Sequence, residues 1–386
     1  DATADMEGGT LNTMNGTAGI NNLIVTHNGK KYQLDSVMLA SVNQVDKSDF
    51  DFRSALLGLR FNGNISPTTL PTVLTAFLNN YFPFSAKKTQ VLTGDTSKFN
   101  FEIQLHNHPI LSEVLLPELK EFDPGLITGS FDNQKKELKF NAIMKHILYG
   151  TTEINDLELD VSSDSTALDY KLSGAGISTA QINFESPLLK GRIADKTITA
   201  GLSSVDKEGN KKLQILTTLT KEKTNYLLKF YPEGFYLMNK RWDIAADNAI
   251  EIGKSGFMIH HLFMNNGNSQ INIASVNNKM NDDVNINIKN FKLEDLSQII
   301  EKDSSLLKGD VNGKVLLKRV NNAYGIIADA GIDNLYLFNK PIGNLTLNAQ
   351  NPTTKRFDLL ATLSGADNQL NAKGFFVPNG GENSLN

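Results

Sequence analysis

Apolar and polar residues alternate with a period of two along most of this chain. Such alternation is typical of β-strands that have one apolar face and one polar face. Turn-forming Asn and Gly residues separate the runs, as in His27-Asn28-Gly29-Lys30, and favour hairpins between antiparallel neighbours. The clearest predicted strands are Phe101–Leu105, Ile154–Leu159, Leu213–Leu219, Tyr226–Phe230, Ile271–Ile273, Val284–Ile288 and Leu345–Leu347.

Three short segments change to helical spacing. Apolar residues recur every three or four positions over Leu70–Tyr81, after Ser66 and Pro67, which suit a helix start. Similar spacing predicts helices over Pro109–Phe122 and over Leu293–Ile300. Each segment is too short to be stable alone, so we expect its apolar side to pack against another part of the protein.

The fold class follows from the number of strands. The pattern implies roughly twenty to twenty-five strands, and open sheets of more than ~10 strands curl or split. Asn is also abundant, at 43 of 386 residues, which favours turns over helices. We therefore predict an all-β, mostly antiparallel protein. Its apolar faces either pack together as a sandwich or line the groove of a curved sheet, and alternation alone leaves both open.

An internal repeat is predicted, with units at 99–176 and 284–366. In each unit a strand precedes a predicted helix, and similar short motifs of apolar residues and glycine follow in the same order. The pairs are Leu126–Gly129 with Leu306–Gly309, Ile154–Leu159 with Ile342–Leu347, and Leu172–Ala175 with Leu363–Ala366. We interpret 1–386 as a fragment of one elongated module.

Composition excludes several kinds of chemistry. The chain has no Cys, which rules out disulfides, Cys-ligated metal sites and thiol nucleophiles. Its net charge of −4 gives no basic field, so we expect no nucleic-acid partner. No run of about 18 apolar residues predicts a membrane-spanning helix, and no export signal opens the sequence.

Candidate catalytic and metal-binding motifs are weak. His106 and His108 would share one face of a strand, but no definite third ligand is indicated, and His260 and His261 would point to opposite faces. Gly253-Lys254-Ser255 lacks the first glycine of a phosphate-binding loop. We therefore predict no enzyme activity, no cofactor and no metal, and favour binding or scaffolding.

Two further clusters have simple interpretations. Lys135, Lys136 and Lys139, like Lys211 and Lys212, are most simply solvated hairpin charges, and contact with anionic lipid headgroups is the alternative. Trp242, Arg241, Tyr231, Phe235 and Tyr236 form the densest aromatic region, which favours core packing over a docking surface.

Several motifs occur in a recognisable order in the second half of the chain. The sequence from roughly Phe99 onward resembles the TamB family, the translocation and assembly module proteins of the AsmA-like superfamily, in a form typical of Bacteroidetes. The motifs that carry the resemblance are Phe230-Tyr-Pro-Glu-Gly234, Trp242-Asp243, Asn248-Ala-Ile250, Gln270-Ile-Asn-Ile273, Asn290-Phe-Lys-Leu-Glu-Asp-Leu296, Leu307-Lys-Gly309, Gly343-Asn-Leu345 and Ala372-Lys-Gly374.

The resemblance implies a fold, a location and partners. It implies an elongated, strongly curved, taco-shaped β-sheet with a lengthwise hydrophobic groove. TamB-like proteins are anchored in the inner membrane, cross the periplasm and meet an Omp85-family barrel in the outer membrane. They are associated with phospholipid transport and with outer-membrane protein assembly. We expect this chain to be periplasmic, with phospholipids as ligands and the barrel as a partner of the full-length protein, through parts outside this sequence.

The expected function is that of a bridge-like lipid transfer segment, which supports outer-membrane biogenesis by moving phospholipid along the groove. A periplasmic scaffold or chaperone for outer-membrane proteins is the alternative, and a surface adhesin-like protein is a third hypothesis. The groove is expected to be lined by Phe101, Ile103, Leu105, Leu157, Leu159, Ile215, Leu228, Phe230, Ile271, Ile273, Ile286, Ile288, Leu345, Leu347 and Leu363.

Overall fold

The chain forms two compact units. Unit 1 comprises Asp1–Ala180 and Phe184–Ser204, and unit 2 comprises Gln181–Asn183 and Val205–Asn386. The structure is a computed structural model that describes residues 1–84, 96–179, 183–237, 239–295, 307–320, 323–353, 356–365, 367–377 and 384–385.

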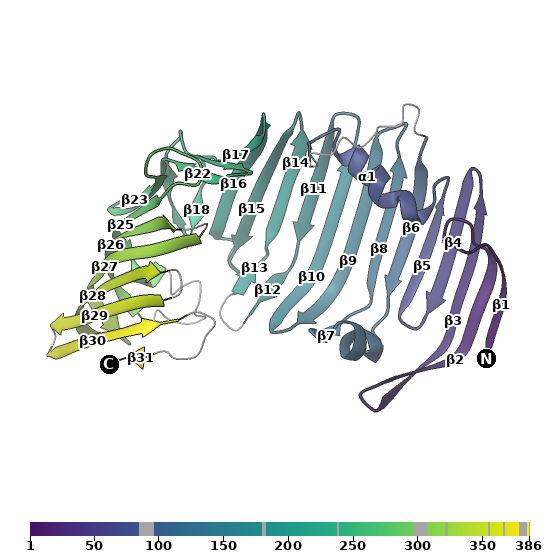
Figure 1. Ribbon diagram of the computed structural model, residues 1–386, viewed down its shortest axis with the longest axis horizontal. Helices are drawn as coiled ribbons and strands as arrows, with labels where there is room; N and C mark the ends of the chain where they lie inside the picture. The colour runs from purple at the N-terminus through teal and green to yellow at the C-terminus, as the bar shows by residue number, and fades with distance from the viewer. Residues whose placement is uncertain are drawn as a thin grey trace. The chain divides into compact units, whose positions relative to one another are not determined.

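Unit 1 is an antiparallel meander, in which nearly every strand pairs with the next one along the chain (Figure 1). Two short strands lie outside the main strand order: β7 (Leu119–Phe122) pairs with β9, and β12 (Gly176–Ser178) pairs with β10. A third short strand, β13, covers Asn183–Glu185. The main order is β1 (Ala2–Glu7), β2 (Asn15–His27), β3 (Lys30–Gln44), β4 (Lys47–Ser54), β5 (Leu57–Gly63), β6 (Lys98–Leu105), β8 (Gly125–Asp132), β9 (Glu137–Tyr149), β10 (Thr152–Ser163), β11 (Ala167–Ser173), β14 (Leu188–Ala194) and β15 (Thr197–Val205).

Unit 2 contains two groups of antiparallel strands. In the first, β16 (Lys211–Glu222), β17 (Asn225–Phe230), β21 (Ala249–Gly253) and β22 (Gly256–His260) pair in turn, and β18 (Tyr236–Leu237) joins β16 to β19 (Lys240–Arg241). The second is a sheet with the order β20 (Asp243–Ile244), β23 (Leu262–Asn266), β24 (Ser269–Ser275), β25 (Val284–Lys292), β26 (Leu307–Val320), β27 (Ala323–Leu337), β28 (Lys340–Thr353), β29 (Arg356–Gly365), β30 (Asn368–Phe376) and β31 (Ser384–Leu385).

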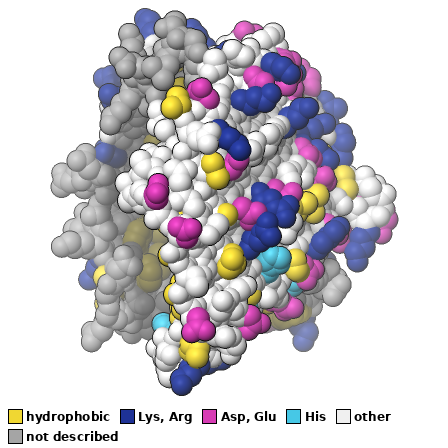
Figure 2. Space-filling model, turned by 90° about the vertical axis from the view of Figure 1, so that its right-hand side faces the viewer, with side chains coloured by type: hydrophobic (Ala, Val, Ile, Leu, Met, Phe, Trp, Pro, Cys, Tyr) yellow, Lys and Arg dark blue, Asp and Glu magenta, His cyan; other side chains and the backbone are white. Residues whose placement is uncertain are grey.

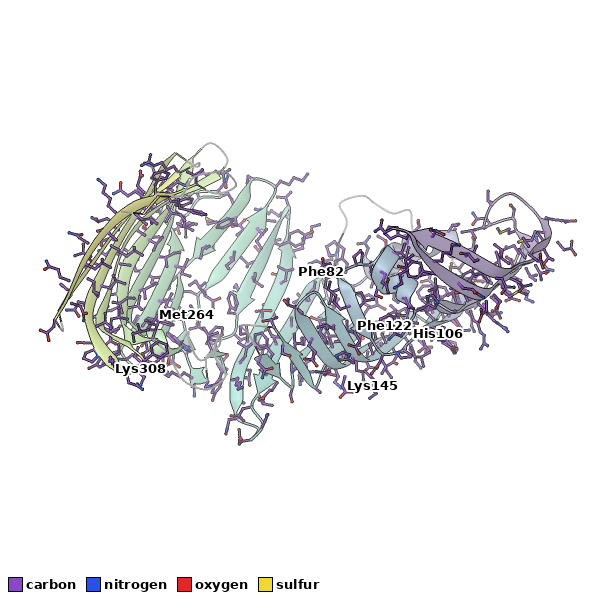
Figure 3. All side chains as sticks on the ribbon, turned by 90° about the horizontal axis from the view of Figure 1, so that it is seen from below. Phe82, His106, Phe122, Lys145, Met264 and Lys308 are labelled. Carbon is purple, nitrogen blue, oxygen red and sulfur yellow. The ribbon has the colours of Figure 1, made fainter. Side chains whose placement is uncertain are left out.

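The predicted all-β fold class is confirmed. Strands dominate both units, their pairings are antiparallel, and helices are few and short. Figure 3 shows the curvature within unit 2, where the strands from β23 to β30 turn progressively along the sheet. That a single groove runs lengthwise through the whole chain stays a prediction.

The repeat anchors fall on corresponding strands, with one copy in each unit. In the first copy they lie on β6, β8, β10 and β11 of the run β6–β8–β9–β10–β11. In the second they lie on β25, β26, β28 and β29 of the run β25–β26–β27–β28–β29. Leu306 and Ala366 lie outside the described residues. That the two runs are copies of one module stays a prediction.

The first predicted helix is present and ends earlier than expected. α1 covers Leu70–Leu78 and follows the 3-10 turn η1 (Pro67–Thr69). The Ser66 hydroxyl accepts a hydrogen bond from the Thr68 N–H, as a helix cap does. The third predicted helix begins with residues 293–295, and its remaining residues lie outside the described part of the chain.

The second predicted helix, Pro109–Phe122, is wrong in its second half. Its helical part covers residues 109–115 and ends in the π-helical turn η2 (Leu111–Leu115), after which β7 forms. Pro117 explains the break, because a proline disfavours helical backbone at the residue before it. Leu116 accordingly has φ −136° and ψ 76°. The leucine spacing continues past this point, but the backbone cannot follow it.

α1 covers one end of the apolar face of unit 1, above β6 to β9 in Figure 1. Phe77 of α1 packs edge-on against Phe131 of β8, with ring centroids 4.9 Å apart, and Phe131 stacks on Phe99 of β6 at 5.1 Å. These three side chains are at most 2% exposed. The Tyr81 hydroxyl donates to the carbonyl oxygen of Asp164 at 2.5 Å, which ties the chain just after α1 to the β10–β11 turn.

η2 and the residue before it, Ile110, cover another part of that face, over β2 and β3. Ile110 packs against Tyr32 and Leu34, and all three are buried. Glu113 accepts hydrogen bonds from Lys30 Nζ at 2.7 and 2.5 Å and from the Tyr32 hydroxyl at 2.7 Å. The helical turn is therefore held to the β2–β3 hairpin by both apolar and charged contacts.

A buried cluster around Trp242 fills part of unit 2. Trp242 is 1% exposed, and Phe235, Ile244 and Phe291 are buried with it. The rings of Trp242 and Phe291 stack with centroids 6.0 Å apart. Strands of both groups contribute partly buried side chains to this packing. The predicted core role of the aromatic region is confirmed for Trp242 and Phe235, whereas Tyr231 is 39% exposed.

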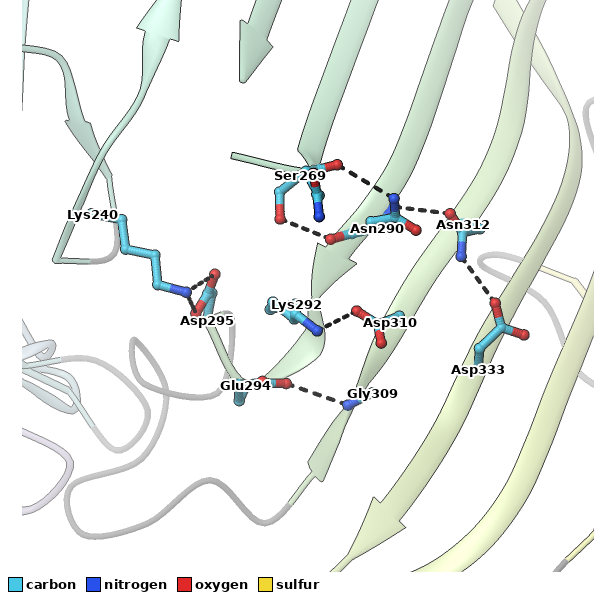
Figure 4. Close-up of polar contacts among 11 residues, drawn as sticks. Lys240, Ser269, Asn290, Lys292, Glu294, Asp295, Gly309, Asp310, Asn312 and Asp333 are labelled. Atoms are coloured by element: carbon cyan, nitrogen blue, oxygen red, sulfur yellow. Dashed lines mark hydrogen bonds and ion pairs between the residues drawn. The ribbon is translucent and has the colours of Figure 1, made fainter. Parts of the chain in front are cut away.

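A short motif reverses the alternation inside several strands. Strand periodicity alone would place Ile288 and Phe291, three residues apart, on opposite faces. Both pack at the Trp242 cluster, because Asn290 between them has a positive φ of 48°. Figure 4 shows the polar contacts that hold this position, from Ser269 through Asn290 to Asn312. The same Ile-x-(Asn or Asp)-(Leu or Phe) pattern, with a positive φ at its third residue, occurs at Ile20–Leu23, Ile154–Leu157, Ile288–Phe291 and Ile332–Leu335.

Candidate functional site

A continuous apolar row crosses unit 1 beside the parts covered by α1 and η2. The cross-strand register places one apolar residue of each strand directly opposite the next, from β2 to β15. We call this set the central row. It consists of Ala18, Leu39, Phe52, Leu59, Ile103, Ile127, Ala142, Leu159, Leu172, Leu189 and Leu202.

The central row is open to solvent. None of its residues is buried, and Leu202 is 40% exposed. In a sandwich, a facing sheet would bury such residues in a core about 10 Å thick. Their partial exposure means that no second layer of described residues is pressed onto the row. Unit 1 therefore presents a band of Leu, Ile and Phe side chains across its strands.

A second row, nearer to α1, contains aromatic residues and small neighbours that accommodate them. Phe101, Gly129 and Phe140 are successive cross-strand partners on β6, β8 and β9. The Phe101 ring lies over Gly129, where an added Cβ would be only 2.2 Å from a ring carbon. On β14, Gly191 similarly makes room for the ring of Tyr170. Any larger residue at either glycine would displace the ring that now covers it.

The fifteen predicted lining residues all lie on strands, and none of them is buried. In unit 1, five share the apolar face on β6 and β10. In unit 2, three share a face of β16 and β17, and seven share a face of the sheet from β24 to β29. In the order of these three groups they are Phe101, Ile103, Leu105, Leu157 and Leu159; Ile215, Leu228 and Phe230; and Ile271, Ile273, Ile286, Ile288, Leu345, Leu347 and Leu363.

Four of these residues take part in the Trp242 cluster, namely Ile215, Phe230, Ile271 and Ile288. Their apolar surface is largely used in packing the interior of unit 2. Leu347, in contrast, is 38% exposed and lies three strands away from β25. The face of unit 2 is thus filled near β24 and β25 and open near β28.

Sequence reasoning missed several members of the central row. Some of the missed members are partly exposed to solvent, like the predicted Ile103 and Leu159. They are Leu59, Ile127, Leu172 and Leu189. The signal was obscured where two apolar residues are adjacent, as in Leu126-Ile127 and Leu188-Leu189, because alternation then does not say which residue faces inward. Only the register between strands assigns Ile127 and Leu189 to the apolar face.

The opposite face of unit 1 is polar and charged. Asp51, Arg60 and Glu102 are cross-strand partners on β4, β5 and β6, and Asp51 also pairs with Arg53 at 2.5 Å. The hydrogen bond from Arg53 holds the pKa of Asp51 below its ordinary value. Figure 2 shows basic and acidic side chains interspersed over the face it presents. In Figure 3, Lys145 and Phe82 lie on opposite sides of the sheet of unit 1.

The histidine pairs do not assemble a metal site within the described residues. His108 Nδ1 accepts a hydrogen bond from the backbone N–H of Ile110, and His261 Nδ1 lies 2.8 Å from Asp247 Oδ1. No group of three or more His, Asp or Glu side chains in the described part of the chain is placed to hold an ion. These contacts place His108 in a local turn and His261 beside the Asp247 carboxylate.

No helix in the described part of the chain is both long and apolar enough to cross a membrane. Comparisons with models of protein families, with curated proteins and with solved structures found no match to this chain.

Proposed function

We propose that this chain is a lipid-conducting segment, which holds the acyl chains of phospholipids on the apolar face of its curved sheet. The observation that supports this most directly is the open central row of unit 1. A row of partly exposed Leu, Ile and Phe side chains that crosses so many strands is costly in water, and a ligand that covers it stabilises it. Soluble proteins rarely leave such contiguous surface uncovered unless it binds something.

Acyl chains match the shape and chemistry of this surface. Each methylene removed from water contributes ~0.8 kcal/mol, so a chain lying along several residues of the row gains enough to be held. The row offers continuous apolar lining, in contrast to a pocket with a few converging polar groups. Such a surface suits many lipids and permits sliding. The covers formed by α1 and η2 limit where a chain can lie.

The proposed biological role follows from the resemblance to the TamB family. In that role the chain is a periplasmic part of a bridge between inner and outer membranes, acts without catalysis, and supports outer-membrane biogenesis. Phospholipid is the proposed cargo, and an Omp85-family barrel is the proposed partner of the full-length protein.

The test is a lipid extraction from the purified chain, followed by quantification of bound phospholipid. Leu159→Arg with Leu189→Arg places two charges in the central row, and we expect bound lipid to fall at least about tenfold, since each charge must be desolvated beneath an acyl chain. The matched control is Leu126→Arg with Ile143→Arg, because these residues lie on the polar face, 40% and 36% exposed.

The control should retain its lipid. Equal lipid in all three proteins, or none in the wild-type chain, would refute the proposal. The chaperone alternative is tested separately, with unfolded outer-membrane barrel protein added as a competitor of the bound lipid. If it displaces nothing and binds the wild-type chain and both variants alike, the apolar row is not a client surface.

A further inference from the structure

A cleft of about 860 Å³ lies at the rim of unit 1, where three hairpin turns meet the end of α1. The turn after β8 contributes Lys136, the turn after β10 contributes Ser165 and Thr166, and the turn after β14 contributes Asp195 and Lys196. The remaining lining residues are Asn80, Tyr81, Arg192 and Ala194.

The position of Tyr81 fixes the walls of this cleft. Its carbonyl oxygen accepts a hydrogen bond from the Lys196 N–H at 3.0 Å, and its hydroxyl donates to the carbonyl oxygen of Asp164. Tyr81 is itself 4% exposed. The Tyr81 hydroxyl is also 3.4 Å from the carbonyl oxygen of Lys136, so all three turns are tied through backbone atoms to one buried residue. The cleft does not depend on long, mobile side chains for its shape.

The cleft lies between the apolar and polar faces of the sheet. Tyr81 and Asn80 border it from the side that α1 covers. Arg192 borders it from the polar face, because its neighbour Ile193 is buried on the apolar face opposite Leu168. A molecule with a polar head and an apolar tail can therefore place its head in the cleft and its tail on the open face.

Basic groups outnumber acidic groups in the lining. Lys136, Arg192 and Lys196 face one carboxylate, that of Asp195. Arg192 is already paired with Asp169, at 3.0 Å. Lys196 makes no ion pair with any residue that the structure describes, and Lys136 Nζ donates only to the neutral amide oxygen of Asn133 among those residues.

The nearby carboxylate of Asp164 is satisfied locally. It accepts hydrogen bonds from the Thr166 hydroxyl and from the backbone N–H groups of Thr166 and Ala167. These bonds hold the pKa of Asp164 below its ordinary value. Two lysine ammonium groups, the Ser165 hydroxyl and the Asn80 amide remain as donors, a set that suits phosphate oxygens.

We propose that this rim cleft binds the phosphate of a phospholipid headgroup, with Lys136 and Lys196 as its cationic contacts. The inference rests on the proposed function and specifies its ligand, because it assigns a headgroup position to the lipid whose tails lie on the apolar face. A lysine near an anionic lipid surface contributes roughly five-fold in affinity, and two contribute roughly thirty-fold.

The test uses Lys136→Gln with Lys196→Gln, and Lys171→Gln with Lys190→Gln as the control. The control removes the same charge from a cross-strand pair on the polar face of β11 and β14. The probes are a phosphatidic acid with a fluorescent acyl chain, a diacylglycerol with the same tails, and inorganic phosphate alone. Thermal unfolding of each variant verifies the fold.

We expect the cleft variant to lose roughly thirty-fold in affinity for phosphatidic acid and to bind diacylglycerol unchanged, whereas the control changes neither. Equal losses in both variants, or an equal loss for diacylglycerol, would overturn the headgroup site. Tight binding of inorganic phosphate that the cleft variant abolishes, without any binding of phosphatidic acid, would assign the cleft to a free phosphate compound and overturn the lipid assignment. Failure of the wild-type chain to bind diacylglycerol refutes the acyl-chain surface separately, and the phosphate arm still reports on the cleft.

Discussion

The backbone N–H of Asn290 on β25 donates to Oδ1 of Asn312 on β26, at 2.8 Å. This contact is made where Asn290 adopts a left-handed backbone conformation, which removes its N–H from the regular ladder between the two strands. Asn312 Nδ2 in turn donates to Asp333 on β27, at 3.0 Å (Figure 4). A chain of side-chain hydrogen bonds thus stabilises the point at which the alternation of β25 reverses.

Substitution of Asn290 should separate backbone conformation from side-chain contacts. Asn290→Ala should lower the free energy of unfolding by about 1–2 kcal/mol, because alanine lacks the short polar side chain that lets Asn adopt this left-handed φ. Asn290→Gly should lower the free energy of unfolding by only a small fraction of that amount, since glycine adopts a positive φ freely. Urea denaturation measures both values. Equal losses for the two variants would contradict a conformational role for Asn290.

Removal of the acceptor gives an independent result. Asn312→Ala leaves the partly buried N–H of Asn290 without its partner, and we expect a loss of about 1–3 kcal/mol in unfolding free energy. Asn348→Ala is the matched control, because the Asn348 amide donates to Asp329 on the exposed surface. The control should change stability by less than about 0.5 kcal/mol. A control as destabilising as Asn312→Ala would mean that any Asn removal weakens this sheet.

Phe235 should contribute strongly to the stability of unit 2. Phe235→Ala removes a buried ring beside Trp242 and should cost about 3–5 kcal/mol. Trp242 is the only tryptophan in the chain, so its fluorescence during urea unfolding reports on this cluster directly. Tyr231→Ala, at a residue 39% exposed, should change the midpoint little. Comparable shifts for both variants would argue against a localised cluster.

Covered and open parts of unit 1 should respond differently to truncation. Phe131→Ala, beneath α1, should cost about 3–5 kcal/mol. Leu159→Ala, in the central row, should cost less than about 2 kcal/mol in lipid-free protein, because water already contacts part of this side chain. Urea denaturation measures both. A loss at Leu159 as large as a fully buried leucine would give, up to about 5 kcal/mol, would indicate that the row is covered.

The attachment of η2 should depend on pH. The hydrogen bond from Lys30, together with that from Tyr32, holds the pKa of Glu113 below its ordinary 4.5, and the bond to Glu113 raises the pKa of Lys30 and of Tyr32. The Glu113 contribution is present above pH 4.5 and is lost as the pH falls through the lowered pKa. The Lys30 and Tyr32 contributions are present below about pH 10 and are lost as the pH rises through their raised pKa values.

Hydrogen exchange of the segment around η2 tests this dependence. Protection should be greatest between those limits and should decline on the acid side in the wild-type chain. Glu113→Gln should reduce protection at neutral pH and remove the acid-side decline. Lys145→Gln is the control, because Lys145 pairs with Asp156 on the polar face, away from η2. An unchanged acid limb in Glu113→Gln would assign the pH response to other groups.

Much of the fold was predictable from the sequence because alternation is a local property. Period-two runs such as Phe101–Leu105 are confirmed as strands, and the turn at Asn28 and Gly29 has the positive φ values that these residues favour. The helix at Leu70 was predictable because its spacing and its Ser66 cap agree. These features need no knowledge of distant contacts.

Other features depend on long-range contacts that no local pattern encodes. The helix expected up to Phe122 fails because Pro117 overrides an apolar spacing that is otherwise helical. The candidate site was found in part, because Ile103 and Leu159 alternate clearly, whereas Leu189 follows another leucine and is assigned only by pairing with Leu172. Packing of Ile288 against Trp242 required the three-dimensional arrangement of both strand groups in unit 2.

The reversing motif also affects how these strands can change in evolution. A one-residue insertion in an ordinary strand moves every following side chain to the wrong face. A strand such as β25 already contains a residue, Asn290, that resets the phase, so a single insertion or deletion there can be absorbed by gaining or losing one left-handed position. Sheets built in this way can vary strand length in single-residue steps and still keep their apolar side chains on one face.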